Sequence, residues 1–204
     1  MKKIFCLLML LCLAGCTNDN DGTTGSLPEK TTTGKNTFGC TVDGVNFVPK
    51  KKNGFSIYYT PELVTRYFKV DWQDSSFKKG FYLQIYAFNL ITEKDIVIQL
   101  NGSYEPLVEG KTYKITTENF GSFSARYSFS TQKQDEKYSN VYYVTHHDYK
   151  TSDNYVGELT ITKLDEKNLI IAGTFWFEGM YEADQTTTKI QDGRFDLKYT
   201  PYIN

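Results

Sequence analysis

From residue 37 onward, apolar residues alternate with polar or small ones at a period of two, and this pattern constrains the fold more than any other feature. In the first such run, Phe38, Cys40 and Val42 are separated by single smaller residues. Successive side chains of a β-strand point to opposite faces of a sheet, so the alternation predicts half-buried strands. Helical spacing of apolar residues is missing, and only residues 61–66 could form a short helical turn.

Turn residues divide this region into twelve strand-like runs, which predict about eleven strands. Asp43-Gly44 is a favoured two-residue hairpin turn, and residues 165–168 are expected to form a four-residue hairpin loop. Gly173, inside a strand, predicts a bulge or a close backbone approach, and Asp192-Gly193 is expected to begin the last strand. The strand-like runs are residues 38–42, 45–49, 55–60, 67–72, 81–88, 96–100, 112–116, 122–130, 141–145, 157–164, 169–178 and 189–199.

Many short strands at this spacing predict an all-β domain, which we assign to residues 37–204. The chain contains 16 Tyr and 14 Phe, residue types that favour pleated, half-buried surfaces. We expect a single antiparallel β-sandwich, with a lipocalin-like β-barrel as the alternative.

The first fifteen residues have the features of a secretory signal. Lys2 and Lys3 form a positive start, and residues 4–13 form an apolar run. A run of this length is too short to span a bilayer, which needs about 20 residues. The run ends in Leu13-Ala14-Gly15-Cys16, which looks like the bacterial lipobox. We therefore predict a lipoprotein signal peptide over residues 1–15, cleavage before Cys16, and lipidation of Cys16 as the membrane anchor.

A lipobox cysteine predicts a cell-envelope protein, most simply one held in the outer membrane. Residues 16–36 are polar and are expected to form a flexible tether. Asp19 and Asp21 partly match the acidic surface-export signal of Bacteroidota lipoproteins, which favours outward display. The alternative interpretation of this segment is a solvated linker.

Cysteine usage and charge limit the other functions. Cys6 and Cys12 are lost with the signal peptide, so Cys40 is the only thiol left and no internal disulfide can form. Cys40 lies in a strand-like run and is expected to be a buried small hydrophobe rather than a nucleophile. Cleavage also removes Lys2 and Lys3, which changes the net charge from −1 to −3, so nucleic acid is not an expected partner.

The motifs that suggest chemistry are weak. His146 and His147 are neighbours that should point to opposite faces of a strand, and His146 with Asp148 supplies only two ligands where zinc needs at least three. We expect His146 and His147 to be a pair at a strand end or in a loop, with no metal and no cofactor. Asp165 and Glu166 lie in a predicted hairpin loop. The pair Asp135-Glu136 lies in the polar stretch 130–139, expected to be a solvated loop. No catalytic motif is found, and we predict no catalytic residue.

The aromatic residues are more informative. Tyr58-Tyr59 and Tyr142-Tyr143 are adjacent pairs within strands, so one Tyr of each pair faces away from the other. On a solvated face, exposed Tyr can stack on sugar rings or contact a protein partner. The alternative is that both faces are covered, or that the rings only pair across strands.

The C-terminal part carries a family resemblance. The stretch "YVGELTITKLDEKNLIIAGTFWFEG", followed by "TTTKIQDGRFDLKYT", resembles a family of Bacteroidota lipoproteins that share a domain of unknown function. The matching motifs are residues 157–162, 164–168, 173–177 and 190–196, and "TFGCTVDGVNFVP" resembles the family's opening hairpin. The resemblance implies a secreted, lipid-anchored, β-rich domain and brings no activity and no catalytic residues.

We therefore expect a lipid-anchored envelope protein, either periplasm-facing or surface-displayed, that binds or scaffolds a glycan or protein through an aromatic-rich β face, without enzymatic activity. One alternative is an envelope-anchored hydrolase of polysaccharide or peptide, which requires converging carboxylates or a His beside a nucleophile. The other is a carrier of a small apolar ligand, which requires an internal cavity lined by Phe and Leu.

Overall fold

The computed structural model describes residues 25–51, 61–73, 77–138 and 140–201, and these ranges contain eleven strands and no helix. No helix in the described ranges is long and apolar enough to cross a membrane. The strands are β1 (Thr37–Val42), β2 (Val45–Phe47), β3 (Leu63–Val70), β4 (Gly80–Asn89), β5 (Lys94–Ser103), β6 (Thr112–Ile115), β7 (Phe123–Gln134), β8 (Tyr142–Lys150), β9 (Gly157–Asp165), β10 (Ile170–Met180) and β11 (Thr187–Lys198).

All eleven strands belong to one sheet, in the order β2-β1-β11-β10-β9-β6-β7-β5-β4-β3, and β8 pairs with β7 and β10 off this path. The ladders between strands are antiparallel except for a single β6–β7 contact, Ile115 with Phe123. Two isolated parallel bridges, Lys50–Asn89 and Arg66–Thr200, join further segments. The sheet is therefore mixed rather than purely antiparallel.

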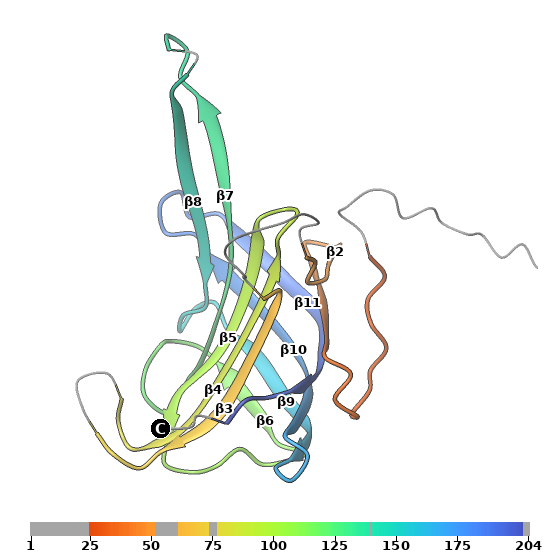
Figure 1. The fold of residues 1–204 in the computed structure, drawn as a ribbon. Coiled ribbons are helices and arrows are strands. Elements are labelled where there is room, and N and C mark those ends of the chain that lie inside the picture. The colour runs from red at the N-terminus through yellow and green to blue at the C-terminus, as the bar shows by residue number, and fades with distance from the viewer. Residues whose placement is uncertain (1–24, 52–60, 74–76, 139, 202–204) are drawn as a thin grey trace, which may run out of the picture.

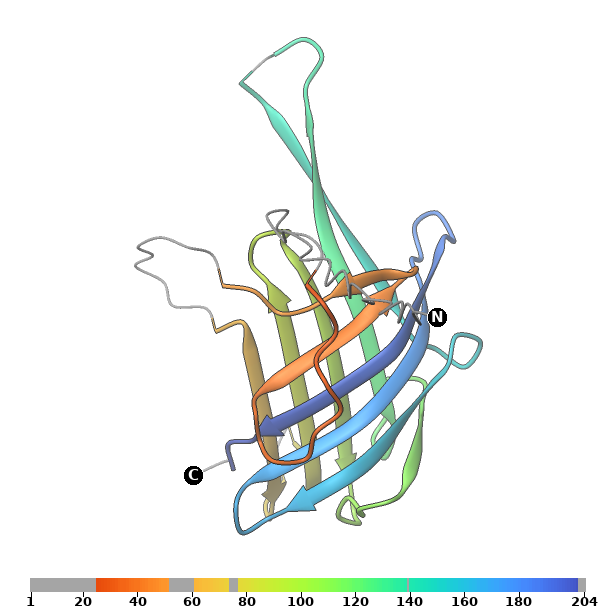
Figure 2. The ribbon, with the colours of Figure 1, turned by 90° about the vertical axis from the view of Figure 1, so that its right-hand side faces the viewer.

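The sheet folds over on itself, so that β1, β11, β10 and β9 lie across β3, β4, β5 and β7 (Figure 2). The predicted all-β, sandwich-like class is confirmed. The strand order has two ends, β2 and β3. Beside β3, the chain after β11 makes one backbone hydrogen bond, from the Thr200 N–H to the Thr65 carbonyl at 2.9 Å.

The core fills the space between the two halves, because every second residue of each strand faces inward. Branched side chains of β4 and β5 meet those of β9, β10 and β11, and each one fully buried stabilises the fold by about 1.5–3 kcal/mol. Cys40 lies in this core with no exposed surface, as predicted. The largest fully buried side chains are Phe177, Leu83, Ile85, Ile96, Ile98, Ile115, Leu159, Ile161, Ile171, Ile190, Leu197 and Val70.

The predicted turn chemistry is confirmed at two positions. Asp43 and Gly44 have φ angles of 49° and 83° and join β1 to β2, which is the type I′ geometry favoured by tight hairpins. At Gly173 the β9–β10 register shifts, and a Cβ there would lie 2.4 Å from the Thr160 carbonyl oxygen. Gly173 is thus a close backbone approach, and it lies opposite a bulge whose unpaired residue, Thr162, belongs to β9.

Several predicted boundaries are wrong. Residues 61–66 form no helical turn, because β3 begins at Leu63. Asp192-Gly193 does not begin the last strand but lies inside β11, where Asp192 has a φ of 51° and the pairing with β10 is irregular. The β9–β10 loop is shifted by one residue, since Asp165 still pairs with Ile170. The predicted strand 55–60 lies outside the described residues.

The segment before β1 is attached to the sheet, which corrects the expectation of a flexible tether for residues 25–36. The buried Asp196 carboxylate of β11 accepts hydrogen bonds from the Thr31 hydroxyl and from the backbone N–H groups of Thr33, Gly34 and Lys35, at 2.6–3.3 Å. Burial raises the pKa of Asp196, but these four bonds together outweigh it and lower the pKa below its usual value. Residues 16–24, with the predicted lipidation site Cys16, lie outside the described residues.

Candidate functional site: an aromatic pocket below a projecting arm

The β7–β8 hairpin projects beyond the sheet (Figure 1). Strand β5 pairs with β7 only as far as Phe129, while β7 and β8 stay paired up to Gln134 and Tyr142. We call residues 130–146 the arm. The predicted loop 130–139 is therefore wrong in its first half, because residues 130–134 belong to β7.

The arm exposes apolar and aromatic side chains on both of its faces, because no other layer covers it. Tyr142 and Tyr143 are 57% and 58% exposed, so the expected exposure of Tyr on a solvated face is confirmed for this pair and extends to both of its members. The other predicted pair, Tyr58-Tyr59, lies outside the described residues. The exposed large hydrophobic residues of the arm are Tyr138, Val141, Tyr142, Tyr143 and Val144.

Asp135 shapes the turn of the arm. Its carboxylate accepts hydrogen bonds from the backbone N–H groups of Tyr138 and Lys137 and from the Tyr143 hydroxyl, at 2.7–2.9 Å. The bonds from Tyr138, Tyr143 and Lys137, in that order, lower the pKa of Asp135. This carboxylate is therefore a turn-forming group, and no acid–base role is needed to explain it.

A pocket with a volume of about 360 Å³ lies at the base of the arm, and we call it the arm-base pocket. It forms where the β1–β2 hairpin, the β4–β5 turn, the start of β11 and the base of β7 and β8 meet. Its size lies within the range of about 300–1,000 Å³ usual for small-molecule sites. Its lining residues are Val42, Asp43, Val45, Asn46, Phe47, Asn89, Thr92, Lys94, Tyr127, Phe129, Tyr149, Thr187 and Thr188.

Aromatic rings of β7 and β8 form one wall of the arm-base pocket. The ring centroids of Tyr127 and Phe129 are 5.7 Å apart, and those of Phe129 and Tyr149 are 6.2 Å apart. The stack extends beyond the pocket lining to the segment after β10, since the His147 ring lies 4.6 Å from Phe129 and 5.1 Å from Tyr181. Burial, with the nearby Asp43 carboxylate, raises the pKa of Tyr127 to about 12, so its phenol is neutral at physiological pH.

Polar groups complete the pocket, and most of them hold the surrounding loops. Asp43 accepts hydrogen bonds from the Thr188 hydroxyl and the Lys189 N–H, both at 2.8 Å. The Asn89 side chain accepts from the N–H groups of Ile91 and Thr92 at 3.1 Å. The Thr92 hydroxyl differs from these groups, because it is buried and has no hydrogen-bond partner among the described residues. A buried hydroxyl without a partner costs about 1–3 kcal/mol, and a ligand in the pocket would bond it only after the Thr92 side chain turns toward the pocket.

The two histidines lie inside β8, not at a strand end or in a loop as predicted. They point to opposite faces, as expected. The His146 Nδ1 is 2.8 Å from the Ser130 hydroxyl on the facing strand, and the His147 Nε2 is 3.0 Å from the Thr131 hydroxyl. Over the described part of the chain, no group of three or more His, Cys, Asp or Glu residues is placed to hold a metal ion.

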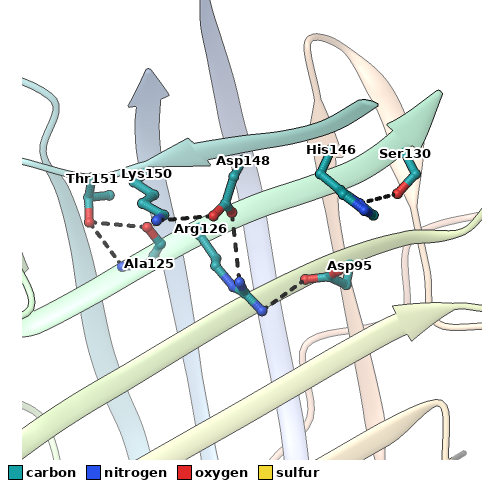
Figure 3. Close-up of polar contacts among 8 residues, drawn as sticks. All are labelled: Asp95, Ala125, Arg126, Ser130, His146, Asp148, Lys150 and Thr151. Atoms are coloured by element: carbon teal, nitrogen blue, oxygen red, sulfur yellow. Dashed lines mark hydrogen bonds and ion pairs between the residues drawn. The ribbon is translucent and has the colours of Figure 1, made fainter. Parts of the chain in front are cut away.

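A charged cluster lies on the outer face of β5, β7 and β8 (Figure 3). The Arg126 guanidinium lies 3.8 Å from a carboxylate oxygen of Asp95 and 3.8 Å from one of Asp148, and Lys150 lies 3.1 Å from the other Asp148 oxygen. Burial raises the pKa of Asp95, against the opposing effects of a Ser128 hydrogen bond and of Arg126. The two carboxylates therefore converge on a shared cation and not on an open reaction centre.

Sequence reasoning missed this cluster and the Ser130–His146 pair. The signal was present in β7, where Ser124, Arg126, Ser128 and Ser130 occupy every second position and so share one face. A polar face is also what solvent exposure alone produces, so the pattern does not by itself indicate a site.

The remaining candidate residues are structural. Burial raises the pKa of the Cys40 thiol far above its ordinary value, so it is not a thiolate nucleophile. Asp165 accepts two hydrogen bonds from Asn168 in the β9–β10 turn, and these lower its pKa. Exposed Glu166 lies in the same turn.

Two other cavities are less defined as sites. The larger, about 590 Å³, lies between the N-terminal segment, β1 and β3, and its rim includes Pro49 and Pro61. These residues flank segment 52–60, which lies outside the described residues, so the structure does not define the outer wall. The smaller, about 280 Å³, is a polar hollow beside Arg126 and Lys150.

No family model, no curated protein and no solved structure matches this chain. The site is therefore interpreted from its own residues.

Proposed function

We propose that this protein is a lipid-anchored component of a bacterial cell envelope that binds a glycan without altering it. In this proposal Cys16 fastens the chain to the outer membrane, and the arm-base pocket takes the saccharide. The observation that supports the pocket most strongly is the combination of a stacked aromatic wall with the unpartnered Thr92 hydroxyl.

The anchor is supported by the lipobox at the end of the apolar run, Leu13-Ala14-Gly15-Cys16. Acylation of Cys16 would add about 0.8 kcal/mol of membrane affinity for each buried methylene group.

A glycan fits the chemistry of the arm-base pocket better than an apolar ligand does. A sugar ring presents C–H groups to an aromatic face and hydroxyl groups around its edge. Phe129 and Tyr149 would contact the ring face. The Lys94 ammonium in the lining would bind the sugar hydroxyl groups, and the Thr92 hydroxyl would join it when its side chain turns toward the pocket. The mixed lining differs from the Phe and Leu cavity that an apolar carrier requires.

The same lining argues against glycoside cleavage in this pocket. Hydrolysis of a glycosidic bond generally needs a pair of carboxyl groups about 5–10 Å apart. Asp43 is the only carboxylate among the lining residues, and both of its oxygens accept hydrogen bonds from Thr188 and Lys189.

A glycan array tests the proposal. The purified full-length protein is applied to an array of neutral and acidic oligosaccharides from bacterial, plant and animal sources. We expect saturable binding to a related group of saccharides. Tyr149→Ala, which removes one aromatic face, should reduce that binding at least tenfold. Tyr149→Phe should retain the stacking and most of the binding.

Tyr104→Ala is the control, because Tyr104 is an exposed Tyr that packs on Phe120 and is not among the residues that line the pocket. It should bind as the unmodified protein does. An array without hits, or equal binding by Tyr149→Ala and the unmodified protein, would overturn the glycan assignment. Mass spectrometry of the N-terminal peptide tests the anchor separately.

The alternative is a hydrolase, and one observation favours it, the 2.8 Å contact between Ser130 and His146. These residues are directly opposed across the β7–β8 ladder, where facing polar side chains commonly bond. An orienting partner for the second ring nitrogen of His146 is not found among the described hydrogen bonds. A fluorophosphonate probe that labels Ser130 in the unmodified protein, but not in His146→Ala, would favour the hydrolase.

A further inference from the structure

The chain that leads to the proposed lipid enters the domain at the same end as the arm. The Asn46 side-chain amide donates a hydrogen bond of 3.0 Å to the Gly25 carbonyl, and Asn46 also lines the arm-base pocket. The arm projects from this end of the molecule (Figure 1). The membrane attachment and the arm are therefore on one side of the domain.

The distance between the lipid and the domain is limited by covalent geometry. Residues 25–36 are held on the sheet by Asp196, so only residues 17–24 separate Cys16 from the attached chain. Nine steps from Cys16 to Gly25 span at most about 30 Å when fully extended. The arm-bearing end of the domain must then lie within that distance of the membrane surface.

The arm is long enough to cross much of this gap. From Ser130 to Gln134 it extends five residues past the last β5–β7 pair, and each residue adds about 3.4 Å, so the strands alone rise about 17 Å. The turn of the arm adds further length. The arm tip is therefore the part of the described domain that first reaches a membrane on this side.

The side chains of the arm tip fit a lipid surface better than a protein surface. Tyr142 and Val144 lie on one face of the two-stranded ribbon and Tyr143 on the other, and all three are at least half exposed. A protein partner commonly covers one face of a strand pair, whereas a membrane interface surrounds an inserted tip. Tyr is enriched at such interfaces, where its ring is buried and its hydroxyl stays in water.

We infer that the arm tip is a second membrane contact, and this inference rests on the proposed acylation of Cys16. The side chains that enter the interface of the bilayer holding the lipid are those of Tyr138, Val141, Tyr142, Tyr143 and Val144. The tip also contains Lys133 and Lys137 beside Asp135 and Glu136. Their charges balance, so apolar and aromatic burial drives the contact.

A fluorescent probe at the arm tip tests this contact in the full, acylated protein. Tyr142→Cys is labelled with the environment-sensitive dye NBD, and labelling is selective because Cys40 is buried and Cys16 is acylated. The protein is reconstituted into vesicles of phosphatidylethanolamine with a minor share of phosphatidylglycerol. We expect a several-fold rise in NBD emission on reconstitution, and quenching by lipids that carry a nitroxide on the acyl chain.

Tyr104→Cys with the same label is the matched control. Strand β5 begins at Lys94 in the arm-base pocket and ends at Ser103, so Tyr104 lies at the opposite end of the sheet and is 74% exposed. The label at position 104 should show neither the rise in NBD emission nor the quenching by nitroxide lipids. An acylated protein whose label at position 142 behaves like that at 104 would overturn the membrane contact alone. A protein recovered without acyl groups on Cys16 would overturn this inference together with the proposed anchor.

Discussion

At the scale of single residues, Thr92 connects the stability of the domain to its proposed function. Its buried hydroxyl has no hydrogen-bond partner among the residues that the structure describes. Thr92→Val keeps the shape of the side chain and removes the unpaired group, so we expect the free energy of unfolding to rise by about 1 kcal/mol. The same change should weaken saccharide binding at least threefold, because the ligand loses a hydrogen bond.

Urea unfolding and a titration with the best array saccharide measure the two effects of Thr92→Val. A purely structural threonine would show a change in stability without a change in affinity. A loss of stability in Thr92→Val would show instead that the hydroxyl has a partner in solution.

Asp196 is the residue that attaches the N-terminal segment, and its contribution depends on pH. Its pKa is lowered in the folded protein, so its stabilising effect is complete above the unfolded value of about 3.9 and is lost as the pH falls toward the folded value. Asp196→Asn replaces the carboxylate acceptor by an amide and should destabilise the protein by about 2–4 kcal/mol at pH 7.

Urea unfolding between pH 7 and pH 3 checks this prediction. The difference in stability between the unmodified protein and Asp196→Asn should narrow as the pH falls below about 4. A difference that does not change with pH would mean that the four hydrogen bonds do not depend on the ionised carboxylate.

At the scale of the strand pairs, Gly173 allows β9 and β10 to approach closely. A Cβ at this position would lie 2.4 Å from the Thr160 carbonyl oxygen and 2.6 Å from the Phe195 ring. Gly173→Ala should therefore destabilise the domain by about 1–3 kcal/mol, measured as a lower midpoint of urea unfolding. Gly44→Ala is a useful comparison, because its Cβ would meet no atom within 4 Å and only its φ of 83° opposes the substitution.

The arm, by contrast, should contribute little to folding. Tyr142 and Val144 are already exposed, so Tyr142→Ser with Val144→Ser should change the free energy of unfolding by no more than about 0.5 kcal/mol. Tyr127→Ala removes a buried ring at the base of the arm and should cost about 3–5 kcal/mol. Thermal unfolding compares the double variant with Tyr127→Ala. A similar loss of stability in both would contradict the expectation that the arm contributes little to folding.

Strands that alternate between core and solvent could be predicted from the sequence, because burial of one face imposes the period of two. Strand β8 was predicted too short, since residues 145–150 lie at or near the solvent on both faces and have no such pattern. The attachment of residues 25–36 could not be predicted either. Their polar composition is that of a linker, and the Asp196 carboxylate that binds them is about 160 residues away in sequence.

At the scale of the whole molecule, the arm-base pocket could not be derived from any local motif. Its wall combines the β1–β2 hairpin, the β4–β5 turn, the arm base and the start of β11, which only the folding of the sheet brings together. The sequence did indicate its chemistry in part, through the expected exposure of Tyr in strands. Tyr127 and Tyr149, which form the wall, were not singled out. A partly buried Tyr and a core Tyr occupy the same inward positions in the alternating sequence of a strand.

The proposed anchor, the arm-base pocket and the arm lie on the same side of the domain. If Cys16 is acylated, mass spectrometry of the N-terminal peptide from the purified protein will show a chain that begins at Cys16 with added acyl groups. An intact segment 1–15, or an unmodified Cys16, would contradict the anchor.

The central claim is that a saccharide binds in the arm-base pocket, and NMR of the aromatic side chains tests it most directly. With Tyr and Phe rings isotopically labelled, the best saccharide from the array is titrated into the protein. The account predicts saturable shifts centred on Tyr127, Phe129 and Tyr149, which line the pocket. Shifts confined to Tyr142 and Tyr143 at the arm tip, or no shifts at all, would contradict it.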